Sequence, residues 1–74
     1  MRFSKRGAAE CRVYVSTSIG GLDKIHMDGL DIAAAENVAE RESLENPALF
    51  LIVTSQGERV STFRNGRRIR SARI

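Results

Sequence analysis

The alternation of apolar and polar residues predicts two strands in the first third of the chain. From Cys11 to Ile19 every second residue is apolar or small and the residues between them are polar. This period of two is typical of a half-buried strand. Gly20-Gly21-Leu22 follows, and we expect it to form a three-residue hairpin loop. A second short strand then passes through Ile25 and Met27.

The middle of the chain has the pattern of a single amphipathic helix. The stretch DGLDIAAAENVAERESLE is rich in alanine and glutamate, which favour helix. We expect the helix to run from about Asp31 to Glu45, with Asp28 or Asp31 as its N-cap, and to end at Asn46-Pro47. At 100° per residue, the apolar stripe would consist of Leu30, Ala33, Ala34, Val38 and Leu44.

Three more strands are expected after the helix. Residues 48–55, ALFLIVTS, are apolar at successive positions, which is typical of a central strand covered on both sides. Residues 55–58 form a turn, 59–64 a strand, Asn65-Gly66 a second turn, and 67 to about 74 a last strand. The sequence therefore predicts an α+β fold of order β-β-α-β-β-β. A small antiparallel sheet of about four to five strands has one helix packed on a face.

The chain is expected to form one domain. Residues 1–9 lack periodicity and are interpreted as a flexible basic lead-in, and residues 10–74 as a single α+β domain. The expected core consists of Val13, Val15, Ile19, Leu30, Ala34, Val38, Leu49, Leu51, Val53 and Val60.

Charge is segregated along the chain. Its 74 residues carry a net charge of +3, but residues 23–45 hold seven acids against two bases, and residues 57–74 hold six arginines against one acid. The single cysteine, Cys11, excludes an internal disulfide, and no apolar run is long enough to span a membrane. These features indicate a cytoplasmic protein with charged partners rather than a membrane protein.

The last twelve residues, FRNGRRIRSARI, contain five arginines around Asn65-Gly66. The turn favours a folded hairpin over a free basic tail. Strict alternation would point Arg67 and Arg73 one way and Arg68 and Arg70 the other, although the pattern also allows a bulge. Guanidinium groups match phosphates and carboxylates, so we expect a partner-binding surface made of Arg64, Arg67, Arg68, Arg70 and Arg73. The alternative is a sheet edge protected by charge.

Two further groups are candidate contacts. Tyr14, on the polar side of the first strand, would offer a platform for stacking a base, or would only pack against the neighbouring strand. On the helix, Glu36, Glu40 and Arg41 would contact a partner, or would form an ordinary solvated face.

Catalysis receives no support from the sequence. His26 is the only histidine, and no nucleophile stands in an arrangement with a base. Gly20-Gly21 lacks the spacing of a phosphate loop. We therefore expect a non-enzymatic protein with no cofactor and no bound metal.

The layout of the chain resembles that of small inhibitors encoded by phages or mobile elements, of the anti-CRISPR kind. The resemblance covers CRVYVSTSI, DIAAAENVAERESLE, LFLIVTS and RVSTFRNGRRI, and it rests on architecture without a diagnostic motif. It implies a protein module that binds a nucleic-acid-processing complex such as a CRISPR effector in the host cytoplasm and blocks its DNA binding or nuclease recruitment. The alternative is a small nucleic-acid-binding protein that uses the arginine-rich hairpin. We expect the protein to be a monomer or a homodimer.

Overall fold

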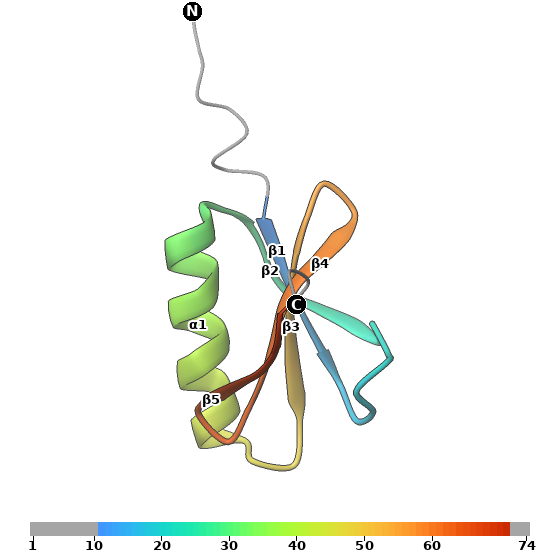
Figure 1. The fold of residues 1–74 in the computed structure, drawn as a ribbon, viewed down its shortest axis with the longest axis vertical. Helices are drawn as coiled ribbons and strands as arrows, with labels where there is room; N and C mark the ends of the chain where they lie inside the picture. Colours follow the sequence, from blue (N-terminus) through green and yellow to red (C-terminus); the bar gives the residue numbers. More distant parts are fainter. Residues whose placement is uncertain (1–10, 72–74) are drawn as a thin grey trace, which may run out of the picture.

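The computed structural model describes residues 11–71, which form one helix and five strands (Figure 1). In chain order these are β1 (Cys11–Ser16), β2 (Lys24–Leu30), α1 (Ile32–Glu45), β3 (Phe50–Ser55), β4 (Glu58–Arg64) and β5 (Arg67–Ser71). The predicted α+β class and the β-β-α-β-β-β order are confirmed. The lead-in of residues 1–9 and Arg73 lie outside the described residues.

The five strands form one antiparallel sheet of order β2-β1-β3-β4-β5, and α1 lies along one face of it (Figure 1). β3 is the central strand. Leu51, Ile52 and Val53 each have an exposed fraction of 0%. The central strand is therefore buried on both faces, as predicted, but it begins at Phe50 rather than at Ala48.

The main core lies between α1 and the sheet. It consists of Cys11, Val13, Ala35, Ala39, Leu51, Val53 and Phe63. The predicted helix stripe is wrong in part, because Ala33 is exposed and Leu44 is 60% exposed. The inward-facing residues are Ala35, Ala39 and Ser43, four residues apart on one helix face. Their small side chains bring the helix backbone close to the sheet.

Most of the predicted core is correct. Val13, Leu51 and Val53 are fully buried, and the half-buried residues are Val15, Leu30, Ala34, Val38, Leu49 and Val60. The prediction that Ile19 belongs to the core is wrong, because β1 ends at Ser16 and Ile19 is 39% exposed.

The predicted three-residue loop is also wrong, because residues 17–23 all belong to the connection between β1 and β2. The Ser16 hydroxyl donates a hydrogen bond to the Asp23 carboxylate at 3.0 Å and accepts one from the Ser18 backbone N–H at 3.1 Å. These local bonds replace a continuation of the strand. β2 in turn runs further than expected and contains Asp28.

Asp31 is the N-cap of α1. Its backbone is extended, and its carboxylate accepts a hydrogen bond of 2.8 Å from the Ala34 N–H. This bond satisfies one of the free donors at the helix start. The helix ends at Glu45, as predicted, and the Asn46 N–H still donates to the Glu42 carbonyl at 2.9 Å.

Two tight turns shape the second half of the sheet. Asn65 and Gly66 have φ values of 55° and 79°, and Gln56 and Gly57 have values of 54° and 84°. Positive φ at both central residues is the type I′ geometry, which matches the twist of the strands it connects. The predicted Asn-Gly turn is confirmed.

Candidate functional site: the open face of the sheet

The face of the sheet opposite α1 carries the densest group of arginine and aromatic side chains. The cross-strand pairs show which residues share this face. Tyr14 pairs with Ile52, which in turn pairs with Thr62. Thr54 pairs with Arg12 on one side and with Arg59 on the other. We call this surface the open face and define it as Arg12, Tyr14, Phe50, Ile52, Thr54, Arg59, Thr62, Arg64 and Arg67.

The floor of the open face is closely packed. Ile52, Thr62 and Thr54 have exposed fractions of 0%, 1% and 4%. Tyr14 and Phe50 are half-buried. The surface presented to solvent is therefore made of arginine side chains and parts of two aromatic rings. It rests on a buried floor that holds those groups in place.

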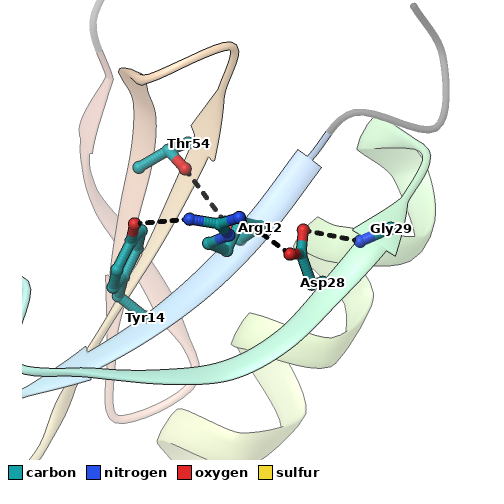
Figure 2. Close-up of polar contacts among 5 residues, drawn as sticks. All are labelled: Arg12, Tyr14, Asp28, Gly29 and Thr54. Atoms are coloured by element: carbon teal, nitrogen blue, oxygen red, sulfur yellow. Dashed lines mark hydrogen bonds and ion pairs between the residues drawn. The ribbon is translucent and has the colours of Figure 1, made fainter.

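Arg12 lies between Tyr14 and Asp28 (Figure 2). Its Nη2 donates to Asp28 Oδ2 at 2.9 Å, its Nη1 donates to the Tyr14 hydroxyl at 3.1 Å, and its Cζ lies 5.9 Å from the Tyr14 ring centre. The hydrogen bond from Arg12, followed by one from the Gly29 N–H, lowers the pKa of Asp28 below its ordinary value. Arg12 therefore orients the ring and neutralises the carboxylate beside it.

Arg64 stacks on Phe50 on the same face. Its Cζ lies 4.6 Å from the ring centre, and its Nε donates to the Pro47 carbonyl at 3.2 Å. Arg67 pairs with Arg64 across the type I′ turn, and both residues are exposed. The turn and the stacking hold these two cations on one side of the hairpin.

Arg59 connects β4 to the β1–β2 connection. Its Nη2 donates to the Gly20 carbonyl at 2.6 Å. A guanidinium has five N–H donors, so this contact leaves others for a partner.

Arg68 lies on the opposite side of the hairpin, toward α1. It pairs with Phe63 of the core, its Cζ lies 5.6 Å from that ring, and its Nη2 contacts Glu36 Oε1 at 2.8 Å. The other oxygen of Glu36 accepts a hydrogen bond of 3.0 Å from Ser61. Arg68 and Glu36, both predicted contact residues, thus bind one another between helix and sheet.

The predicted alternation holds for Arg67 and Arg68 and is interrupted between Arg68 and Arg70 by a bulge, which the sequence pattern allowed. The register shifts between Thr62 and Phe63, so that Arg68 pairs with Phe63 while Arg70 pairs with the adjacent Thr62. A bulge of this kind places an extra residue in one strand. Beyond the bulge, the alternation of side chains between the two faces of the sheet is shifted by one residue. Arg73 lies outside the described residues.

The acidic candidates lie on the helix, away from the open face. Glu40 and Arg41 are exposed and line a shallow depression with Asn37 and Leu44. Glu42 lies 3.8 Å from the His26 imidazole. The charge segregation along the sequence is retained in part in the structure. The four glutamates of residues 23–45 lie on α1 and four arginines lie on the open face, but Asp28 of β2 is paired with Arg12.

The structure adds Arg12, Phe50 and Arg59 to the candidate site. The alternation of residues 11–19 already placed Arg12 on the same strand face as Tyr14. Phe50 lies inside an unbroken apolar run, which gave no indication of its face. Arg59 belongs to the site only because β4 pairs with β3.

Within residues 11–71, no group of three or more His, Cys, Asp or Glu side chains is placed to hold a metal ion. The helix found in this part of the chain is too short and too polar to cross a bilayer. Comparison with known proteins identifies no relative, since no family model, no curated protein and no solved structure matches the chain.

Proposed function

We propose that this protein is a non-enzymatic binding module that contacts a negatively charged partner through its open face. The observation that supports this proposal is the grouping of Arg12, Arg59, Arg64 and Arg67 around two half-buried aromatic rings on a face that α1 does not cover. Asp28, at the β2 border of this face, is already paired with Arg12 and does not repel an anion strongly.

Protection of a sheet edge does not account for these arginines. Edge strands use charge to prevent pairing with another chain. Arg12 lies on β1, and Arg59 and Arg64 lie on β4; both strands have neighbours on each side. Of the four arginines, Arg67 alone belongs to an edge strand, β5. Recognition of an anion accounts for the whole group.

The open face is also preorganised. Arg64 is held by Phe50 and by the Pro47 carbonyl, and Arg12 by Asp28 and Tyr14. Long side chains that are ordered before binding lose less entropy when the complex forms. These contacts favour a surface built for binding.

A more specific hypothesis is that the protein is a phage-encoded inhibitor that binds a nucleic-acid-processing complex in the host cytoplasm. This hypothesis rests only on the order of helix and strands along the chain. It is a special case of the proposed function in which the negatively charged partner is a protein. Arg68 and Glu36 would contribute little to it, because they are paired with each other.

Heparin affinity chromatography tests the proposed function with a defined polyanion. Arg67→Glu should elute at clearly lower salt than the wild-type protein. Arg41→Glu makes the same change in net charge on the exposed side of α1 and serves as the matched control. We expect it to elute close to the wild-type position. Equal shifts for both variants would show that net charge alone governs binding and would contradict a role for the open face.

A further inference from the structure

Two aromatic rings lie close together on the open face. Tyr14 pairs with Ile52, and Phe50 pairs with Ser16, so Tyr14 and Phe50 are diagonal neighbours on adjacent strands. Such positions are about 7–8 Å apart, which allows large side chains to form one continuous surface. Each ring is accompanied by a guanidinium group, Arg12 for Tyr14 and Arg64 for Phe50.

We propose that the partner of the open face is a single-stranded nucleic acid, an inference that rests on the proposed function. Unpaired bases stack on aromatic rings and on guanidinium planes. One base would stack on Tyr14 and another on the outer side of the guanidinium that covers Phe50. Arg67 and the free donors of Arg59 would contact the phosphates.

The composition of the open face distinguishes this partner from an acidic protein. Arginine and aromatic residues are enriched in protein–protein interfaces as well, but interfaces with nucleic acids are more polar and far more positive. The open face as defined holds four arginines and no acidic residue. Here arginines surround the two rings, and the aliphatic Ile52 between them is fully buried. The exposed aliphatic side chain beside this surface is that of Ile25, which pairs with Tyr14 from β2 and is 48% exposed. The aliphatic contact open to a protein partner therefore lies at the β2 border and not between the two rings.

The same geometry favours a single strand over a duplex. Bases in a duplex are already stacked on one another and cannot stack on Tyr14 or on the Arg64–Phe50 pair. A duplex would use the arginines alone. The contribution of the rings is therefore the measurable difference between the two kinds of nucleic acid.

Fluorescence anisotropy with defined probes tests this inference. The probes are labelled 15-nucleotide oligothymidylate and oligouridylate, a 15-base-pair DNA duplex, and a poly-glutamate peptide. We expect at least one of the two single strands to bind more tightly than the duplex, and poly-glutamate to bind most weakly. Each titration is repeated at several salt concentrations.

Variants separate stacking from charge. Tyr14→Leu removes a ring on which a base stacks and should weaken binding of the single strand about 5- to 150-fold without changing the salt dependence. Phe50→Leu removes the ring that holds the Arg64 guanidinium in place and should also weaken binding of the single strand. Tyr14→Phe keeps the ring and is the matched control, which should retain most of the affinity. Arg67→Gln should reduce the slope of log affinity against log salt by about 0.7. Circular dichroism checks that each variant folds, and Tyr14→Trp, which enlarges the platform, tests the ring independently if Tyr14→Leu does not fold.

The outcomes are distinguishable from failure of the proposed function. If the protein binds heparin through Arg67 but binds neither single strand, the inference is wrong and the proposed function stands. Equal affinity for strand and duplex, with no effect of ring removal, would show recognition of charge alone and overturn the inference. Tighter binding of poly-glutamate than of either strand would identify the partner as an acidic protein.

Discussion

The backbone N–H of Gly66 donates a hydrogen bond of 2.9 Å to the hydroxyl of Ser43, so the β4–β5 turn is tied to the last turn of α1. This bond joins the Asn-Gly turn, which positions Arg64 and Arg67, to the element that covers the other face of the sheet. The Ser43 hydroxyl in turn donates to the Glu40 carbonyl at 2.9 Å. The helix therefore holds the β4–β5 turn, and with it one end of the open face, in position.

Gly66→Ala should lower the free energy of unfolding by about 1–2 kcal/mol, because φ at Gly66 is +79° and a Cβ atom is disfavoured in the left-handed region. The added Cβ would also lie 3.0 Å from Leu44 Cδ1, the end of a flexible side chain that is able to move. Urea denaturation measures the change. Gly20→Ala is the control, since nothing lies within 4 Å of its Cβ position, and a loss as large as that of Gly66→Ala would contradict the explanation.

Ala39→Leu should destabilise the fold by about 1–3 kcal/mol, because Ala39 is fully buried where α1 lies against the sheet and a larger side chain would push the two layers apart. Ala33→Leu, on the exposed side of the same helix, should change stability by less than about 0.5 kcal/mol. Thermal unfolding of the two variants gives the comparison. Equal melting temperatures would mean that the helix face has been assigned incorrectly.

Leu51→Ala should cost about 2–5 kcal/mol, a large share of the stability of a chain this small. Leu51 is fully buried in the central strand. The matched truncation Leu44→Ala removes the same atoms from a side chain that is 60% exposed and should have a much smaller effect. Chemical denaturation of both variants is the test, and an unchanged midpoint for Leu51→Ala would show that β3 is not central.

Asp28 should make stability depend on pH in the acidic range. Its pKa in the folded protein is lowered below 3.8, chiefly by the hydrogen bond from Arg12. A carboxylate with a depressed folded pKa contributes stability that is complete above its unfolded pKa and is lost as the pH falls through the folded pKa. The stability difference between wild type and Asp28→Asn should therefore be constant near neutral pH and shrink below about pH 4.

Urea denaturation of both proteins between pH 7 and pH 2 measures this difference, and an NMR titration gives the pKa of Asp28 directly. A difference that stays the same across the whole range, or a pKa above 3.8, would show that the contact between Arg12 and Asp28 does not persist in solution.

Local patterns in the sequence determined the elements. The Asn65-Gly66 turn, the N-cap at Asp31 and the central strand at residues 50–55 each depend on residues adjacent in the chain, so their conformational preferences are readable without tertiary contacts. The α+β order followed from these elements. The sequence also showed that charge is segregated, with arginines toward the end and acids in the middle.

Tertiary contacts decided which side chains from different elements share a face. The inward stripe of α1 is displaced from the predicted one. Ala35 and Ala39 pack against the sheet, and Ser43 accepts a hydrogen bond from the Gly66 N–H of the β4–β5 turn. Arg68 faces Glu36 because it pairs with the core residue Phe63 next to the β4–β5 turn, and the bulge between Arg68 and Arg70 likewise depends on pairing between the two strands. Phe50 and Arg59 join Tyr14 only when β1, β3 and β4 are paired in register. Pairing register and helix position depend on contacts between residues far apart in the chain, and no periodicity within one segment encodes them.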